Sequence, residues 1–294
     1  MRRKEVGKVV RRQIFGGSGT RKGMKRQLLS GVALSAVATV LCASVPEQAQ
    51  AQPPSWTGFY IGLNAGGAFG QSKARTNIDC SIVAPGAGYW CDSTGDGAAN
   101  ATAINSSGSG TINRFGFIAG GQVGYLWQQN QMVYGVETDL NSFNLNGSRQ
   151  ASGIMPVSYG PGGAIAGTTY NISNSFNTSW LYTLRGRVGW LPKPDMLAYV
   201  TGGLAVTRLG VSFNYSDTFP VSTSGSGSAT KTGFALGGGL EWALKDHWTA
   251  KVEYLFVDFS SVTATGNITG YGQAISTSGD LTAHIARLGV NYKF

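Results

Sequence analysis

From residue 56 onward, apolar and polar residues alternate with a period of two, and tracts rich in Ser, Gly, Asn and Thr separate the alternating stretches. This period is typical of β-strands, whose successive side chains point to opposite faces. No apolar stretch in this region approaches the roughly 18 to 20 uninterrupted residues of a membrane-spanning helix. The pattern predicts eight strands, at 56–69, 115–128, 132–141, 178–190, 197–210, 232–244, 248–259 and 281–294.

The predicted strands have two different faces. One face is apolar and aromatic, with Phe59, Ile61 and Leu63 in the first strand. The other is small or charged and carries Asn64, Gln122, Glu137, Asp139, Arg185, Arg187, Glu241, Lys251, Glu253, Arg287, Asn291 and Lys293. A soluble sandwich with its oily face inward gives this alternation. A membrane barrel with lipid outside and a polar interior gives it too.

Three features favour the barrel. Aromatic residues gather at strand ends, as interfacial girdles require: Trp56, Trp127, Trp180, Trp190, Trp242, Trp248, Tyr292 and Phe294. Strands of about 10 to 14 residues can cross a bilayer at a tilt. Short links near Asn130, at 192–195 and at 245–247 alternate with long ones. The predicted fold is therefore all-β, an eight-stranded antiparallel transmembrane β-barrel with short periplasmic turns and long external loops.

The net charge of +9 is concentrated at the N-terminus. Residues 1–51 contain ten of the 23 basic and two of the 14 acidic residues, which leaves +1 for residues 52–294. The mature chain therefore has no basic face that could bind the phosphates of a nucleic acid, and we expect no nucleic-acid partner.

The first 51 residues have the order of a secretory signal peptide. A basic stretch precedes an apolar run at 28–41, and a small-residue site ends at Ala51. Met24 stands directly before the last basic pair, so 1–23 is interpreted as an over-extended start. The sequence predicts a signal peptide at 1–51 and an outer-membrane barrel domain at 52–294, in a Gram-negative cell.

Both ends of the mature chain resemble a known family. The segment 56–67, WTGFYIGLNAGG, resembles the opening strand of the small outer-membrane beta-barrel family called porin family or outer-membrane immunogenic protein. The end of the chain resembles that family's assembly signal, with Leu288, Val290, Tyr292 and the terminal Phe294. The resemblance covers 52–294 and implies an OmpA-like barrel. It also implies two partners, outer-membrane lipid and the barrel-assembly machinery.

Cys80 and Cys91 are the only cysteines that follow the expected cleavage site, and both lie in the first long link. In an oxidising compartment they form either a disulfide or two free thiols. We expect a disulfide that restrains the loop and has no redox function. No histidine lies nearby, which disfavours a metal site.

The charged residues on the polar face should meet inside the barrel. Glu137, Asp139, Glu241 and Glu253 face the same interior as Arg185, Arg187, Lys251, Arg287 and Lys293. The lumen of eight strands is only wide enough for side chains to fill, so buried charges must pair. An interlocked salt-bridge core is one interpretation, and a gated ion path is the other.

Candidate chemistry is otherwise sparse. The glycine runs at 120–124 and 237–239 do not lie between a strand and a helix, as phosphate-binding loops do. His247 and His284 have no nearby triad or zinc-ligand partners in the sequence. We therefore predict no enzyme, no cofactor and no metal. Three functions remain: a structural, surface-exposed barrel in the envelope, a narrow channel for small solutes or ions, or loop-mediated binding of an external ligand.

Overall fold

The computed structural model describes residues 55–294 except 81–87, 92–97, 160–162, 220 and 269–270. The predicted signal peptide and its cleavage site lie outside the described residues. Within them, no helix has the length and apolar character needed to cross a membrane.

The described residues form one helix and nine strands, most of them unusually long. The strands are β1 (Gly58–Ile78), β2 (Gly110–Gln129), β3 (Met132–Asn144), β4 (Asn146–Ile154), β5 (Thr169–Lys193), β6 (Met196–Asp217), β7 (Ser222–Ala243), β8 (Trp248–Asn267) and β9 (Ala274–Lys293). The helix α2 (Ala99–Gly108) lies between β1 and β2 in the chain.

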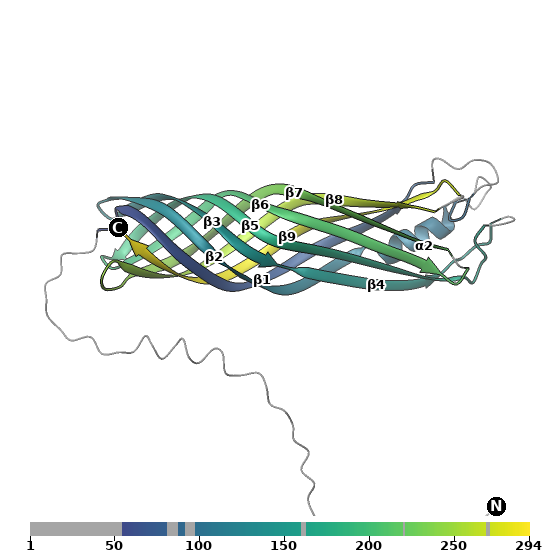
Figure 1. The fold of residues 1–294 in the computed structure, drawn as a ribbon, viewed down its shortest axis with the longest axis horizontal. Coiled ribbons are helices and arrows are strands. Elements are labelled where there is room, and N and C mark those ends of the chain that lie inside the picture. The colour runs from purple at the N-terminus through teal and green to yellow at the C-terminus, as the bar shows by residue number, and fades with distance from the viewer. Residues whose placement is uncertain (1–54, 81–87, 92–97, 160–162, 220, 269–270) are drawn as a thin grey trace, which may run out of the picture. The chain divides into compact units, whose positions relative to one another are not determined.

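The strands close into an antiparallel ring (Figure 1). Except for β3 and β4, each strand pairs with its neighbour along the chain, and β1 closes the ring by pairing with β9. β3 and β4 occupy one position, because both pair with β5 and only Leu145 separates them. The ring therefore has eight positions, as the sequence predicts.

The two ends of the ring differ. At the end that carries the C-terminus, short turns join β2 to β3, β5 to β6 and β7 to β8 (Figure 1). In two of these turns Asn130 and Asp246 have φ values of 54° and 56°, which Asn and Asp tolerate better than other side chains. The opposite end carries α2 and the longer connections.

The strands are longer than the alternating stretches of the sequence predict. β5 has 25 residues and β7 has 22, so each runs well into a Ser-, Gly- and Asn-rich tract whose composition predicts a loop. These small polar residues form the outer face of strands that continue beyond the membrane. α2 was also missed, because 99–108 has no amphipathic pattern.

Two parts of the barrel wall can be distinguished by residue range. The membrane half, at the end with short turns, comprises 58–69, 115–129, 132–144, 180–193, 196–206, 234–243, 248–257 and 284–293. The external half comprises α2 and the strand segments 70–78, 110–114, 146–154, 169–179, 207–217, 222–233, 258–267 and 274–283.

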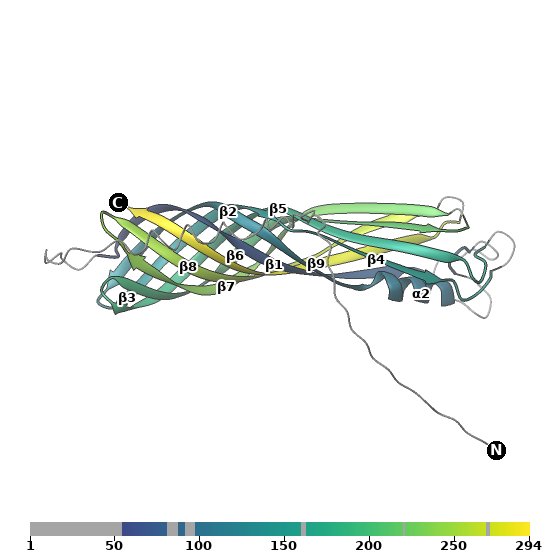
Figure 2. The ribbon, with the colours of Figure 1, turned by 90° about the horizontal axis from the view of Figure 1, so that it is seen from below.

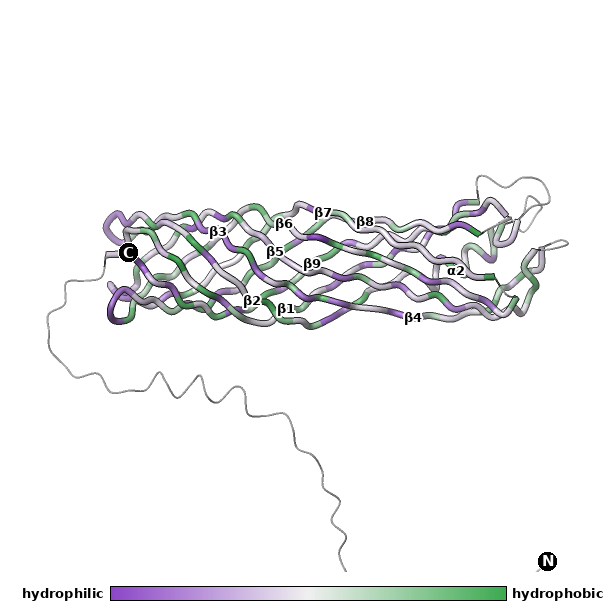
Figure 3. Tube along the Cα trace, in the orientation of Figure 1, coloured by the Kyte–Doolittle hydropathy of each residue, from purple (hydrophilic) through white to green (hydrophobic). Residues whose placement is uncertain are grey.

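In the membrane half, apolar side chains cover the outside. Exposed examples are Phe59, Leu63, Phe117, Trp127, Val136, Leu140, Leu184, Trp190, Val200, Leu236, Tyr254 and Leu288. Phe117 is 75% exposed and Leu63 is 72% exposed, which only lipid makes favourable over so large an area. Strongly hydrophobic and hydrophilic residues alternate along these strands in Figure 3.

In the external half the polarity of the two faces is reversed: the inner face is apolar and the outer face is polar. Inward residues such as Ile172, Phe213 and Leu281 are at most 2% exposed and belong to one continuous apolar cluster. Outward residues such as Asn214 and Ser226 are polar and exposed. This is the arrangement of a water-soluble sheet protein.

The external half also divides into two sheets. The β2–β3 ladder begins at Phe117 and Asn144, and the β7–β8 ladder ends at Gly233 and Phe259. Beyond these points the ladders among the described residues are β4–β5–β6–β7 and β8–β9–β1–β2, two sheets that face each other across the apolar cluster.

At one of the two seams between these sheets, α2 lies beside β1 and β4 (Figure 2). There Arg149 Nη1 donates to the Ser107 carbonyl of α2 at 2.7 Å, and Arg114 Nη2 donates to the Ser148 carbonyl at 3.2 Å. The helix thus continues the wall where the β2 ladder is missing.

Candidate functional site

The candidate site is the charged interior of the membrane half. Strand alternation points Glu137 and Asp139 of β3 inward, together with charged residues of four other strands: Arg185 and Arg187 of β5, Glu241 of β7, Lys251 and Glu253 of β8, and Arg287 of β9. All eight side chains are at most 2% exposed. Buried charges of this number are tolerated only when they are paired and hydrogen-bonded.

Glu137 is the centre of this network. Its Oε1 lies 2.5 Å from Arg185 Nη2, and its Oε2 lies 2.8 Å from Lys251 Nζ and 3.1 Å from Arg187 Nη1. The hydroxyl of Tyr60 donates to Oε2 at 2.7 Å. Residues of β1, β3, β5 and β8 therefore meet at a single carboxylate.

Arg287 joins a second pair of carboxylates. Its Nη2 lies 2.6 Å from Glu253 Oε2 and 3.0 Å from Asp139 Oδ2. Arg185 also reaches both acids, with Nη2 at 2.7 Å from Asp139 and Nη1 at 3.1 Å from Glu253. Each guanidinium thus bridges two carboxylates, and charge-assisted hydrogen bonds of this kind are stronger than those between neutral groups.

Glu241 extends the network to β7. Its Oε2 accepts from Arg187 Nη2 at 2.7 Å, and its Oε1 accepts from Thr249 at 2.6 Å and from Asn291 at 2.8 Å. The Arg187 guanidinium also lies 3.8 Å from the ring centre of Tyr199, a cation–π contact. Four acids thus face four bases, and the network is balanced in charge.

Lys293 lies apart from this network, contrary to the sequence analysis. It is half-buried and makes no ion pair with a described residue. The reason is its position at the end of β9, near the rim of the barrel, where its backbone lies opposite that of Tyr60 in the β1–β9 ladder. Water can solvate the ammonium group there.

A buried tryptophan lies at the periplasmic end of the lumen. The sequence pattern predicts Trp56 in the outer aromatic girdle, and this is wrong: Trp56 is 2% exposed and packs in a cluster with Tyr60, Leu126, Leu197 and others. Its indole Nε1 donates to the Pro194 carbonyl at 3.1 Å. Its backbone N–H donates to Gln128 Oε1 at 2.8 Å, so Trp56 is fastened to β2 and to the β5–β6 turn and fills the interior at this end.

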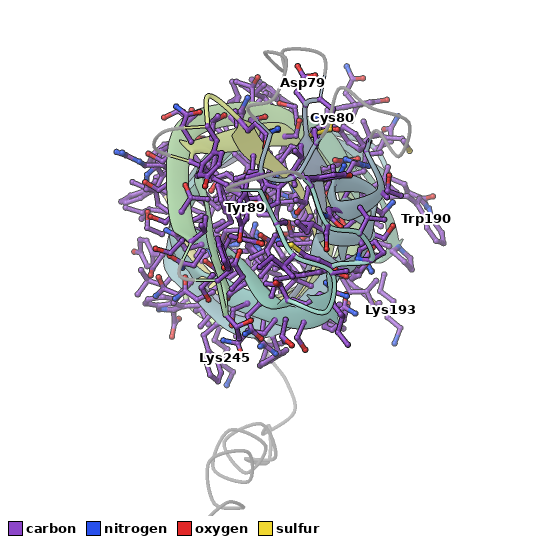
Figure 4. All side chains as sticks on the ribbon, turned by 90° about the vertical axis from the view of Figure 1, so that its right-hand side faces the viewer. Asp79, Cys80, Tyr89, Trp190, Lys193 and Lys245 are labelled. Carbon is purple, nitrogen blue, oxygen red and sulfur yellow. A yellow bond between two sulfur atoms is a disulfide. The ribbon has the colours of Figure 1, made fainter. Side chains whose placement is uncertain are left out.

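The described part of the first long connection covers the external end. Cys80 and Cys91 form a disulfide. Between them in sequence, Tyr89 and Trp90 are fully buried, and their backbone N–H groups donate to the Gln273 amide oxygen at 3.0 and 2.7 Å. Viewed from that end, Tyr89 lies near the middle of the ring (Figure 4). We call Tyr89 and Trp90 with their partners the cap.

The cap is also fastened from the opposite sheet. Tyr89 and Tyr215 both donate their hydroxyl hydrogens to Asp217 Oδ2, at 2.7 and 2.9 Å. Burial raises the pKa of Tyr89 above its ordinary value, and the hydrogen bond to Asp217 raises this pKa further. Burial also raises the pKa of Tyr215. Both phenols are therefore neutral donors at physiological pH.

The residues of the expected assembly signal lie on the outside of β9. Leu288, Val290 and Phe294 are 57%, 47% and 67% exposed, and Tyr292 is half-buried. The Phe294 ring packs against Phe59 and Tyr292, with ring centres 5.7 and 5.2 Å away. These side chains form an apolar ridge where the chain ends.

The described residues contain no group of three or more His, Cys, Asp or Glu side chains that could hold a metal ion. The glycine runs at 120–124 and 237–239 lie within β2 and β7, and several of these glycines pack closely against neighbouring strands. His247 lies in a turn, and the Nδ1 of His284 is 2.5 Å from the hydroxyl of Tyr254.

Several members of the network are uncharged and are not apparent from the charge pattern of the sequence. Tyr60 and Tyr199 donate to Glu137 and Glu253, and Thr183 donates to Asp139 at 2.8 Å. Strand alternation alone predicts that both tyrosines point inward, because each stands next to an outward apolar residue. Their aromatic character concealed it, since tyrosine is expected at a lipid interface.

Comparisons with known proteins agree with this architecture. A family model described as outer membrane protein beta-barrel domain matches residues 35–294. The 31 kDa outer-membrane immunogenic protein of Brucella melitensis is 32% identical over 279 residues, covering 92% of this chain and all of the relative. The 22 kDa outer membrane protein of Rhizobium leguminosarum is 34% identical over 165 residues, covering 52% of this chain and 62% of the relative.

Among solved structures, the outer membrane protein OprG from Pseudomonas aeruginosa matches with a TM-score of 0.39 and 10% identity, over 82% of this chain and 99% of that one. The family assignment rests on the family model and on the Brucella relative, which is matched over its whole length. This chain belongs to the outer membrane protein beta-barrel family and is an outer-membrane protein.

Proposed function

We propose that the protein is a closed structural barrel that contributes to the integrity of the outer membrane and presents its external half at the cell surface. The observation that carries this proposal is the lumen network, in which all eight charged side chains are buried and paired across five strands. In a lumen this narrow, paired side chains take the space that water and ions would need.

Two further features support a closed barrel. The Trp56 cluster lies below the network, and the apolar cluster of the external half lies above it. An ion on the barrel axis would therefore meet apolar packing on both sides of the charges. A surface role is supported by the length of the external half, and the name of the Brucella relative describes that protein as immunogenic.

Conductance across a planar bilayer tests the closed lumen. We expect residues 52–294, refolded and inserted, to show no steady current, and Glu137→Ala to open a leak. Asp280→Ala is the matched control, because Asp280 lies outside the lumen in a half-exposed ion pair with Arg75. A steady wild-type current whose ion selectivity changes in Glu137→Ala, without loss of stability, would establish the narrow channel instead.

The envelope role needs a cellular test. A strain that lacks the protein should become more sensitive to detergent and to large antibiotics that an intact outer membrane excludes. Wild type should restore resistance, and Glu137→Ala should restore less of it than Asp280→Ala. Unchanged sensitivity in the deletion strain would contradict this part of the proposal.

A further inference from the structure

The outer faces of the two external sheets differ in charge. On the β8–β9–β1–β2 sheet, Lys73, Arg75, Asp258 and Asp280 point outward, and Arg75 pairs with Asp280 at 3.5 Å. On the β4–β5–β6–β7 sheet, the outward positions are every second residue of 146–152, 171–177, 210–216 and 222–228. Fifteen of these sixteen residues are Ser, Asn or Gln, and none is charged. We call these sixteen positions the uncharged face.

Strand pairing arranges the uncharged face in rows. One row runs across Ser148, Ser175, Ser212 and Ser226, which pair in register from β4 to β7. Adjacent strands lie about 4.8 Å apart and successive outward residues about 6.7 Å apart, so hydroxyl and amide groups repeat in two dimensions. The side chains are short and project little from the sheet. A groove of about 560 Å³ lies on this surface near Ser212 and Ser226.

Most hydrogen-bonding groups on this face are available to a ligand. Ser175 and Ser212 share one bond at 2.8 Å, and Arg208 Nη2 donates to Ser228 at 3.1 Å. The other side chains of the face make no hydrogen bond with a described residue. Hydroxyls and amides both donate and accept, which is what a partner rich in hydroxyl groups requires. The face lacks the aromatic and apolar anchors on which protein interfaces depend.

The position of the face narrows the choice of partner. β5, β6 and β7 carry the lipid-facing residues Leu184, Leu204 and Leu236 in the membrane half, and the same strands continue directly into the uncharged face. Arg208 lies at the boundary, exposed and without an acidic partner among the described residues. The layer just outside the lipid of a Gram-negative outer membrane consists of lipid-linked sugars and their phosphates.

We propose that the uncharged face docks the saccharide chain of the surrounding outer-leaflet glycolipid, with Arg208 next to its phosphate-bearing base. The sugars would lie along the rows of hydroxyl and amide groups and exchange hydrogen bonds with them. The opposite sheet, with its internal ion pair, has no such role. This inference is independent of whether the lumen conducts.

Paired substitutions test the proposal in the mature protein embedded in lipid nanodiscs. Ser212→Trp and Ser226→Trp place an indole in the middle of the uncharged face, and Ser278→Trp places one at an outward serine of β9 on the opposite sheet. The probe is polysaccharide released by mild acid from the lipopolysaccharide of a Gram-negative host. The second probe is the lipid A that remains, which keeps its two phosphorylated glucosamines but has lost the polysaccharide. Heat-dependent gel migration checks that each variant is folded.

We expect wild type and Ser278→Trp to bind the released polysaccharide alike, and both variants of the uncharged face to bind it about tenfold more weakly. Binding of lipid A should change little in all three variants. Equal loss in Ser278→Trp, or no loss in either variant of the uncharged face, would overturn the proposal. It would also be overturned if wild type bound only lipid A, because the phosphorylated lipid base and not the polysaccharide would then be the ligand.

Discussion

In the membrane half of the wall, Phe117 and Leu236 point outward while Arg185 and Glu253 are buried inside. In the external half of the same ring, Ser226 points outward while Phe213 and Leu281 are buried inside. The same strands run through both halves, and β6 and β9 keep their inward and outward alternation throughout, so strand geometry does not cause the exchange. The surroundings cause it, because lipid favours apolar side chains on the outside and water favours polar ones.

The comparison shows that each half is held together by a different interaction. In the membrane half, the apolar side chains remain in contact with lipid, so burying them inside the barrel would not stabilise the fold. The ion pairs and hydrogen bonds of the lumen therefore hold this half together. The external half is stabilised as soluble proteins are, by burying apolar area between two sheets. Substitutions should therefore have opposite effects at equivalent positions of the two halves.

The largest expected effect is in the lumen. Glu137→Ala leaves Arg185, Arg187 and Lys251 without their shared partner, and this should reduce the free energy of unfolding by about 3 to 5 kcal/mol. Urea titration in detergent, followed by tryptophan fluorescence, measures the loss. Arg75→Ala breaks the half-exposed ion pair of the external half and should cost at most about 1 kcal/mol. Similar losses in the two variants would refute a special role for the lumen charges.

The second effect is in the external core. Leu281→Ala removes a fully buried side chain and should cost about 3 kcal/mol, within the usual range for core leucines. Thr282→Ala, one residue along β9 and facing outward, should stay within about 0.5 kcal/mol. The same titration compares them. If Thr282→Ala were the more damaging change, the assignment of inner and outer faces would be wrong.

The third prediction places the same charge on both halves of one strand. Leu236→Arg puts a guanidinium against lipid and should cost about 2 kcal/mol, whereas Ser226→Arg on the same face of β7 lies in water and should cost less than about 0.5 kcal/mol. Refolding yield into vesicles and urea midpoints report the difference. Equal tolerance of both arginines would show that the lipid boundary lies elsewhere on β7.

The smallest effect concerns the cap. Because the pKa of Tyr89 and that of Tyr215 are raised in the folded protein, both phenols stabilise it fully below their ordinary pKa of about 10. That stabilisation decreases as the pH rises above about 10, because the open state then loses its phenolic protons first. Trp90 fluorescence should report a looser cap at pH 11 than at pH 9. The variant with Tyr89→Phe and Tyr215→Phe should lose this response, and an unchanged response would rule out these phenols as its source.

The strand alternation, short turns and inward charges of the membrane half could be predicted because lipid requires strongly apolar outer residues. The external half was largely missed, since Ser, Thr, Asn and Gly are typical of loops as well as of solvated strands. Trp56 was misplaced because a tryptophan at a strand end is expected in a girdle, and only the path of residues 55–57 turns it inward. The partners of individual charges depend on strand register, which one sequence does not specify.

The small irregularities in the wall have a consequence for how such proteins can diversify. β5 shifts register between Thr178 and Leu181, β8 shifts between Phe259 and Val262, and Leu145 separates β3 from β4. All three lie where polarity inverts along their own strands. An inserted or deleted residue can be absorbed at such points without turning every later side chain to the wrong face. The external half can therefore change length or be exchanged between relatives as a unit, while the charged interior below keeps its alignment.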